Sequence, residues 1–337
     1  MKILLVQTSF LGDTILSTPV IAGIKAIYPE SELWMMTTPL SSALVENDPL
    51  LEGVIPFDKR NQYNGMSGLF KFAKIIKSYQ FDKVYSLHKS IRSSALLTLA
   101  GIPERACFDV AKGAFLYHTK KKRLTDKHDV LRNLSILSEE VNMDDLNSSM
   151  RLFPPEYEAL STTIQSVIDQ NEKYAVLVPG SAWATKMWHS EGYRQTATFL
   201  VARGLKVILM GSADDNNCCK RISKGNDNIV NLAGKTSISE ALYIMNKAQL
   251  AVCNDSMSLH MASAFKIPTI VIFCSTIPEF GYGPWENDKA IVIEKKMDCR
   301  PCGSHGKKAC PAGTSACMEE ISHKEVISAI ESILMAS

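Results

Sequence analysis

Residues 1–29, MKILLVQTSFLGDTILSTPVIAGIKAIYP, decide the fold class. Residues 2–7 are a short apolar run, and the polar stretch TSFLGD separates it from a helical pattern over residues 14–27 that stops before Pro29. This order predicts a strand, a turn and a helix, the unit of which parallel α/β sheets are built. The turn contains Gly12 but no G-x-G-x-x-G, which disfavours an NAD-type dinucleotide-binding domain.

The same alternation of short apolar runs and helical stretches continues along the chain. Further strands are predicted at residues 32–36, 54–57, 83–87, 174–178, 206–210, 250–253 and 269–273, and helices at 90–100 and 157–169. Pro154 and Pro155 mark a boundary, and Ser322 with Glu325 forms a capping box that starts a last helix. We therefore expect an α/β fold of two doubly wound domains, residues 1–155 and 156–321, facing a cleft, with a C-terminal helix over 322–337.

The composition excludes several classes of protein. With 337 residues, 46% apolar and 21% charged, the chain is typical of two globular domains. The apolar run at the N-terminus is too short for a signal peptide, and no window approaches the roughly 18 apolar residues of a membrane span. Nine cysteines without a secretion signal favour cytosolic thiols or metal ligands over disulfides.

The charge is unevenly distributed. Between Lys59 and Arg132 there are 16 lysines and arginines and five acidic residues, a net charge of +11, although the whole chain carries only +2. A basic stretch in an otherwise acidic chain indicates an anionic partner, either nucleic acid, an anionic membrane surface or a phosphorylated substrate. The alternative is a solvated, lysine-rich surface.

The predicted site residues follow strand ends, because ligands bind at the carboxyl ends of strands in such sheets. After the first strand comes Asp13, either an acid that complements the helix dipole or a general base. After residues 174–178, the loop PGSAWATKMW offers Ser181, Thr185 and Lys186, which suit phosphate oxygens.

The segment NDSMSLHMASAFKIP, residues 254–268, predicts a second anion site. Asp255 is expected as the N-cap of a helix over 256–265, or as a ligand contact through its acceptor oxygens. The backbone N–H groups of Ser256, Met257 and Ser258 would then face an anion, favoured by the helix dipole. His260, one turn further on, is either part of this site or a buried structural histidine.

Four cysteines form a C-x2-C-x7-C-x6-C cluster, Cys299, Cys302, Cys310 and Cys317. Close thiolates suit structural zinc, but the spacing differs from paired Cys-x2-Cys modules, so disulfides, free thiols and an iron–sulfur cluster stay open.

Taken in order, these segments resemble the heptosyltransferase family of lipopolysaccharide core glycosyltransferases, which have the two-domain GT-B architecture. The resemblance covers nearly the whole chain. Its carriers are residues 1–29, FDKVYSLHKSIRSSALLTLAGIPER at 81–105, VPGSAWATKMWHSEGYRQTATFL at 178–200, NDSMSLHMASAFKIPTIVIF at 254–273 and the cysteine-containing CRPCG segment at 299–303.

The resemblance implies transfer of L-glycero-D-manno-heptose from ADP-heptose to the inner core on lipid A, with inversion, no required cofactor and a possible structural zinc at the cysteines. Asp13 matches the base, and Lys186 matches the lysine on the donor phosphates. The implied donor-binding residues are Ser9, Gly12, Ser181, Thr185, Asp255, Ser256, Met257, Ser258 and His260. Met257 departs from the family's usual small residue.

The basic first domain then suggests how the acceptor is held. The cations considered are Lys59 and the run Lys120 to Arg123, with Arg60, Lys89, Arg92, Lys120 and Lys122 as the acceptor-binding set. The implied location is cytoplasmic, peripheral on the inner membrane, with anionic lipid but no nucleic acid as a partner. Two other functions stay open: a transferase for another nucleotide sugar, and a non-catalytic binding protein for a nucleotide or anionic lipid, which Asp13 and Lys186 disfavour.

Overall fold

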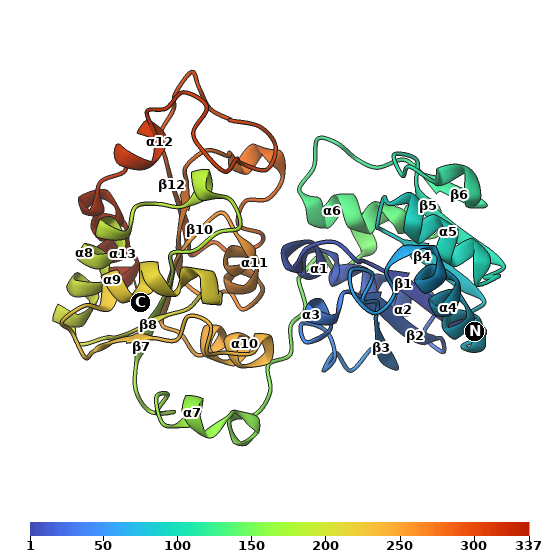
Figure 1. Ribbon diagram of the computed structural model, residues 1–337, viewed down its shortest axis with the longest axis horizontal. Helices are drawn as coiled ribbons and strands as arrows, with labels where there is room; N and C mark the ends of the chain where they lie inside the picture. Colours follow the sequence, from blue (N-terminus) through green and yellow to red (C-terminus); the bar gives the residue numbers. More distant parts are fainter. Residues whose placement is uncertain (337) are drawn as a thin grey trace. The chain divides into compact units, whose positions relative to one another are not determined.

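Two parallel six-stranded sheets, one in each half of the chain, organise the computed structural model, which describes residues 1–336 (Figure 1). The first unit contains residues 1–153 and the second begins at Pro154. Both prolines of the predicted boundary therefore belong to the second unit, two residues earlier than the sequence suggested. The predicted α/β class with two doubly wound sheets is confirmed.

Unit 1 has the strand order β3-β2-β1-β4-β5-β6. Its strands are β1 (Lys2–Val6), β2 (Glu32–Thr37), β3 (Gly53–Pro56), β4 (Lys83–Ser86), β5 (Glu104–Phe108) and β6 (Thr119–Lys121). Its helices are α1 (Leu11–Ser17), α2 (Pro19–Ile27), α3 (Pro39–Ser42), α4 (Gly65–Ser78), α5 (Ile91–Leu99) and α6 (Asp129–Leu134), with the short 3₁₀ turns η1 (Ala114–Leu116), η2 (Ser135–Leu137) and η3 (Met143–Asp145).

Period-two burial explains how the helices cover this sheet. Leu4 and Val6 of β1 pack in one core cluster with Leu69 of α4 and Leu96 of α5. Successive side chains of a strand point to opposite faces, so Leu5, which is also buried, faces the other layer. There α1, α2 and α6 pack against one another. The sheet is thus buried on both faces, as parallel sheets require.

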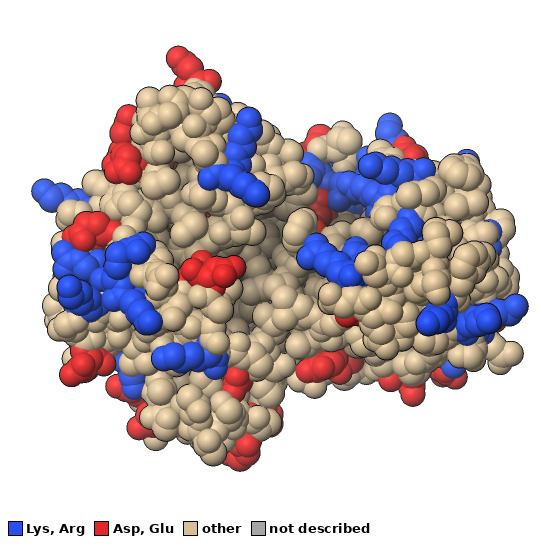
Figure 2. Space-filling view, viewed as in Figure 1, with Lys and Arg blue, Asp and Glu red and all other residues tan. Residues whose placement is uncertain are grey.

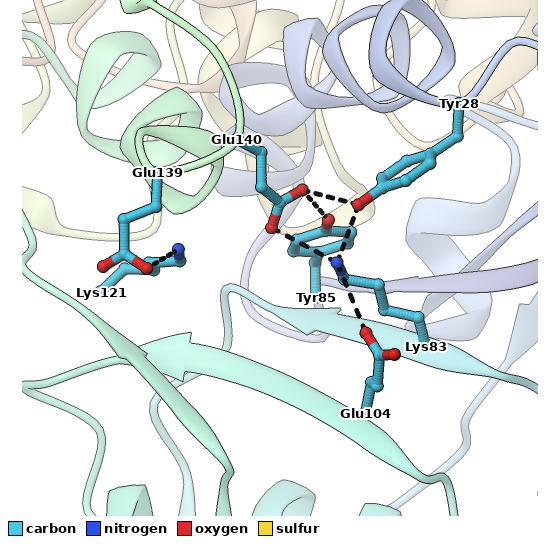
Figure 3. A network of polar contacts seen from close by, with 7 residues as sticks. All are labelled: Tyr28, Lys83, Tyr85, Glu104, Lys121, Glu139 and Glu140. Carbon is cyan, nitrogen blue, oxygen red and sulfur yellow. Dashed lines mark hydrogen bonds and ion pairs between the residues drawn. The ribbon is translucent and has the colours of Figure 1, made fainter.

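A partly buried polar network braces the start of β4 (Figure 3). The Glu140 carboxylate accepts hydrogen bonds from the hydroxyls of Tyr28, at 3.0 Å, and Tyr85. The Lys83 ammonium lies 3.4 Å from Glu140 Oε1 and donates to the Tyr28 hydroxyl at 2.9 Å. Glu104, which is exposed, lies 3.6 Å from the same ammonium. Burial and the Glu140 hydrogen bond raise the pKa of Tyr85, so its hydroxyl keeps its proton.

Glu140→Gln is expected to lower the free energy of unfolding by about 2 kcal/mol, because two hydroxyls and an ammonium lose a charged acceptor. The control is Glu104→Gln, which removes an exposed carboxylate from the same Lys83 and should cost under ~1 kcal/mol. Urea unfolding of both variants measures the difference. Equal losses would mean that burial around Glu140 contributes nothing.

Unit 2 repeats the topology, with the order β12-β11-β10-β7-β8-β9. Its strands are β7 (Tyr174–Val178), β8 (Lys206–Leu209), β9 (Ile229–Asn231), β10 (Leu250–Asn254), β11 (Thr269–Phe273) and β12 (Ala290–Glu294). Its helices are α7 (Thr162–Gln165), α8 (Ser190–Ala202), α9 (Asn216–Ser223), α10 (Ile238–Asn246), α11 (Met257–Ala264), α12 (Ala316–Glu319) and α13 (His323–Ala336), with the 3₁₀ turns η4 (Tyr157–Ala159), η5 (Ala184–Lys186), η6 (Ala213–Asp215) and η7 (Pro278–Phe280).

The C-terminal helix is part of unit 2. Val326 and Ile330 of α13 are fully buried in the same core cluster as Trp188. The Trp188 indole donates to the Ile321 carbonyl at 2.9 Å, just before α13. The predicted capping box is present, since the Ser322 hydroxyl and backbone N–H both donate to the Glu325 carboxylate. Ser337, the last residue of the predicted helix, lies outside the described residues.

Two predicted helices are interrupted. The predicted helix over 14–27 is two helices, α1 and α2, because Pro19 has no N–H to continue the ladder and Thr18 becomes the junction. The predicted helix over 157–169 is only η4 and α7. Between them Leu160 is extended, and the Ser161 N–H bonds to the Glu240 carboxylate at 3.1 Å instead of to its own helix.

Candidate functional site

Each sheet has one point where the strand order reverses, and the loops that leave the two strands there diverge. In unit 1 this point lies between β1 and β4, and in unit 2 between β7 and β10. Crevices that bind ligands form at such switch points in open α/β sheets. Most of the predicted site residues lie in the segments that follow these four strands, which the strand ends alone made predictable.

Asp13 is the third residue of α1, in the segment after β1. Its Oδ2 accepts the Phe10 backbone N–H at 3.1 Å, so the carboxylate caps the start of the helix. The helix-start interpretation therefore has direct geometric support. Asp13 is only half-buried. Its charge also acts on Lys89, whose pKa is lowered by desolvation and by Arg123 and raised in part by the neighbouring carboxylates, Asp13 among them.

Three side chains support the loop that precedes Asp13. Lys59 donates to the Thr8 carbonyl at 2.6 Å, and the Thr8 hydroxyl lies 2.9 Å from His88 Nδ1. The Ser93 hydroxyl lies 2.6 Å from the same nitrogen. Burial and the nearby Lys59 charge lower the pKa of His88 to about 4, so the imidazole is neutral at pH 7. Sequence reasoning missed His88, although it stands two residues after β4 at the switch point.

The lowered pKa of His88 predicts acid sensitivity. The ordinary pKa is 6.5, so on acidification the unfolded chain takes up this proton first, and stability falls between pH 6.5 and about 4. We expect His88 to lower the free energy of unfolding by about 2 kcal/mol when the pH falls from about 7.5 to 4.5. The measurement is urea unfolding at both pH values, with His88→Gln losing that share of the pH dependence. His118→Gln, at an exposed position, is the control, and equal pH slopes for both variants would contradict the assignment.

The predicted acceptor-binding cations have different environments. Arg60, Lys89, Lys120 and Lys122 are exposed. Arg92 instead donates to the carbonyls of Tyr63 and, at 3.0 Å, Gly65, which ties the start of α5 to the start of α4. Within the run 120–123, Lys121 pairs with Glu139 at 2.5 Å and Arg123 with Asp129 at 2.6 Å. Arg92, Lys121 and Arg123 are therefore engaged in contacts within the protein.

In unit 2 the switch point holds a buried ion pair. Lys186 Nζ lies 2.6 Å from Asp255 Oδ2, and the Thr276 hydroxyl donates to the same oxygen at 2.5 Å. The side chains of Lys186 and Asp255 are only 15% and 7% exposed. The prediction that Asp255 caps the next helix is wrong, because Lys186 and Thr276 hold its carboxylate and Ser256 occupies the cap position of α11.

The start of α11 presents unused hydrogen-bonding groups. The cap residue Ser256 makes no side-chain cap bond, and its buried hydroxyl has no partner. The first N–H groups of a helix have no carbonyl of their own helix to bond, and they carry the positive end of its dipole. Ser258 and His260 are buried behind this end, and Met257 is half-exposed. The arrangement suits an anion.

Asn254, which sequence reasoning also missed, positions the loop after β7. Its side-chain amide donates to the Pro179 carbonyl at 2.8 Å and accepts the Trp188 N–H at 3.0 Å, so one side chain holds both ends of the loop. Gly180 in this loop approaches Asp215 so closely that a Cβ would lie 2.2 Å from its carboxylate. Any side chain at this position would have to displace the Asp215 carboxylate, which the Ser212 N–H and hydroxyl hold.

The cysteine tail, defined as residues 299–317, packs against the same loop. The Thr185 hydroxyl bonds to the N–H and carbonyl of Lys307, at 2.7 and 3.1 Å, and to the Ser275 hydroxyl at 3.0 Å. These contacts use the one donor and both acceptor positions of the hydroxyl, so Thr185 holds the cysteine tail. The sequence instead predicted that Thr185 binds the nucleotide-sugar donor. Ser181 is half-buried, and its hydroxyl accepts the Trp183 N–H at 3.4 Å.

The four tail cysteines are free thiols, as are the other five cysteines of the chain. Cys299 is exposed, Cys302 and Cys310 are half-buried, and Cys317 is buried. Backbone N–H groups, that of Ser315 foremost, lower the pKa of Cys310. Among residues 1–336, no three histidine, cysteine or acidic side chains are arranged to hold a metal ion. The proposed zinc or iron–sulfur site therefore stays a prediction.

Three comparisons with known proteins agree on one family. The family model described as glycosyltransferase family 9 (heptosyltransferase) matches residues 69–312. Lipooligosaccharide heptosyltransferase 2 of Campylobacter jejuni is 23% identical, over 100% of this chain and 99% of that protein. Among solved structures, a glycosyltransferase family 9 protein of Veillonella parvula has a TM-score of 0.88 at 22% identity, covering 100% and 98% of the two chains. ADP-heptose lipopolysaccharide heptosyltransferase II of Escherichia coli has a TM-score of 0.80 at 21% identity, covering 100% and 99%.

Proposed function

Because the chain belongs to glycosyltransferase family 9, the heptosyltransferase family, we propose that it transfers heptose from ADP-L-glycero-D-manno-heptose to the inner core of lipopolysaccharide. The acceptor is Kdo-lipid A or heptosyl-Kdo-lipid A. The observation that carries the proposal is the constellation at the unit 2 switch point, in which Lys186, Asp255 and the start of α11 surround one strand end. The curated relatives of matching length are heptosyltransferases by name.

The donor diphosphate binds at the start of α11. Its oxygens accept the free N–H groups of the first turn and the unpartnered Ser256 hydroxyl. Lys186 pairs with Asp255 when no nucleotide sugar is bound. When the donor binds, the Lys186 ammonium turns to the diphosphate. As the bond to the sugar breaks, negative charge grows on ADP, and the ammonium and the helix end stabilise it. Thr276 keeps Asp255 in place while Lys186 exchanges partners.

Asp13 is the general base. Its carboxylate removes the proton from the acceptor hydroxyl while that oxygen attacks the anomeric carbon of heptose, and the carbon–oxygen bond to ADP breaks. One displacement without a covalent enzyme intermediate inverts the anomeric centre. Base catalysis contributes roughly 10²–10⁴-fold, so positioning and electrostatic stabilisation must supply the rest. The chemistry requires no cofactor.

Four exposed cations of the predicted acceptor-binding set hold the anionic acceptor, namely Arg60, Lys89, Lys120 and Lys122. Lipid A and the core sugars carry phosphates and carboxylates, which guanidinium and ammonium groups bind by charge-assisted hydrogen bonds. The pKa of Lys89 is raised in part by the Asp13 charge, and this proximity supports Lys89 as the acceptor cation beside the base. Ser9 and Gly12 shape the loop around Asp13. Because the acceptor is anchored in a membrane by its lipid, we also propose that the protein works peripherally on the inner membrane.

The proposal is tested by incubating the protein with ADP-heptose and defined truncated cores, and reading the mass and linkage of the product. A single heptose added with inverted configuration supports it. ADP-glucose and UDP-glucose are the matched donors. Transfer from one of them, with no transfer from ADP-heptose to any heptose-lacking or heptose-terminated core, would assign the chain another nucleotide sugar.

A further inference from the structure

The large apolar side chains that are exposed among residues 1–336 are concentrated on one layer of unit 1. Six of the eleven belong to the helices α4 and α5 and the turn η1, while unit 2 contributes only Met335. The six are Met66, Phe70, Ile75, Ile91, Leu99 and Phe115. Phe115 is 72% exposed and Met66 is 64% exposed, so these side chains are not the edges of a buried core.

The three elements form one continuous surface, which we call the α4–α5 face. α4 packs along α5, and η1 packs on α5. The Arg92 guanidinium bonds to two carbonyls before and within α4, and a Cβ at Gly113, just before η1, would touch the Ile91 side chain at 2.9 Å. The inner sides of α4 and α5 fill the unit 1 core, which leaves their outer sides exposed.

This face is basic and free of acids. Lys71, Lys74 and Lys77 lie on the exposed side of α4, and Lys112 precedes η1. The three segments that build the face, residues 61–81, 88–103 and 110–122, contain no aspartate or glutamate. In Figure 2 the basic side chains of unit 1 form groups separated by uncharged surface. A protein partner would meet unpaired lysines there, whereas an anionic amphiphile matches both the cations and the apolar groups.

We propose that the α4–α5 face docks the chain on the surface of an anionic lipid bilayer. Phe70, Phe115 and Met66 enter the interface between headgroups and acyl chains, and the lysines pair with the headgroup phosphates. No helix among the described residues is long and apolar enough to cross a membrane. The inference rests on the proposed function, in which the acceptor is a lipid, and it names the surface that meets that lipid's membrane.

The test is sedimentation of the full chain with vesicles of phosphatidylcholine alone, or of phosphatidylcholine with phosphatidylglycerol, without any acceptor. We expect binding only to the anionic vesicles, and weakening with added salt. Lys71→Gln/Lys74→Gln/Lys77→Gln should lower the partition coefficient about 100-fold, at roughly fivefold for each cation. Phe70→Ser/Phe115→Ser should lower it about tenfold.

The matched control is Lys220→Gln/Arg221→Gln/Lys224→Gln, which removes three exposed cations around the end of α9 in unit 2, where no large apolar side chain is exposed. It should bind vesicles as the unsubstituted protein does. Equal losses in both triple variants would overturn the proposal in favour of a net-charge effect. It would also be overturned if the phenylalanine variant changed the oligomeric state in light scattering but kept its vesicle affinity.

Activity separates this inference from the proposed function. The triple lysine variant should transfer heptose to a soluble, deacylated core at the normal rate and lose rate only on acceptor embedded in vesicles. Vesicle binding without transfer from any donor would overturn the function and leave the docking surface standing. Normal transfer on both acceptors by the triple lysine variant would overturn the docking surface alone.

Discussion

Asp13→Asn is expected to abolish heptose transfer almost completely, lowering kcat by about 10²–10⁴-fold, because the acceptor hydroxyl loses the group that takes its proton. The substitution separates the two roles of this residue. An asparagine oxygen still accepts the Phe10 N–H that Asp13 bonds at 3.1 Å, so the helix start is preserved. Melting temperature and ADP affinity, the latter by calorimetry, should therefore change little while kcat collapses.

The matched control for Asp13 is Glu191→Gln. Glu191 is also an acid in the first turn of a helix, α8, and its carboxylate is bound by Arg194 and Gln195 on the surface of unit 2. These hydrogen bonds lower the pKa of Glu191 to about 2, so it is charged at every working pH, as a helix-start acid should be. Its variant should keep full activity. If Asp13→Asn instead lost stability but transferred heptose normally, Asp13 would be a helix cap and no more.

Lys186→Met is expected to lower kcat/KM for ADP-heptose by about 10²–10³-fold, because the diphosphate loses the cation that balances its growing charge. This variant also leaves Asp255 buried without its ion pair, 2.6 Å from where the ammonium stood. Removing one partner of such a pair costs about 3–5 kcal/mol. Lower activity alone therefore does not identify the role of the lysine.

The double variant Lys186→Met/Asp255→Asn resolves this ambiguity. It removes the uncompensated carboxylate, so the melting temperature should recover while ADP affinity and transfer stay low. Lys206→Met, which breaks another ion pair of unit 2, Lys206 to Glu172 at 2.7 Å, controls for the loss of a cation and should retain activity. Recovery of transfer in the double variant would show that Lys186 only neutralises Asp255.

Local patterns predicted the framework of this fold well. β7 and β11 begin and end at the predicted residues. Each is a run of five buried residues, as a strand in a sheet covered on both faces requires, and β11 is also rich in β-branched side chains. Four strands were not predicted, β5, β6, β9 and β12. The edge strands β6 and β9 have only three residues each, too few to show a pattern. The predicted 157–169 helix is broken at Leu160 and Ser161, where the Ser161 N–H bonds to Glu240, a residue distant in sequence.

The strand ends predicted which loops lie at the switch points, but the sequence did not predict which side chains contact one another there. Lys186 and Asp255 were both identified, but their pairing was not, because 69 positions separate them and only the switch point brings them together. Thr185 is a polar residue in a loop that suits phosphate, and nothing in that loop shows that Lys307 uses its hydroxyl. Asn254 and His88 were overlooked because single polar residues at strand ends have no motif.

The contact between Thr185 and Lys307 also has a consequence for how the chain is made. During synthesis, the loop that carries Lys186 leaves the ribosome 122 residues before the backbone that clamps it. Unit 1 has all its strands by residue 121 and its own core, so it can fold early, as N-terminal domains generally do. The loop that carries Lys186, in contrast, gains these contacts only after Lys307 has been made. A nascent polypeptide that ends before Lys307 would carry a complete first unit beside a loop without its clamp.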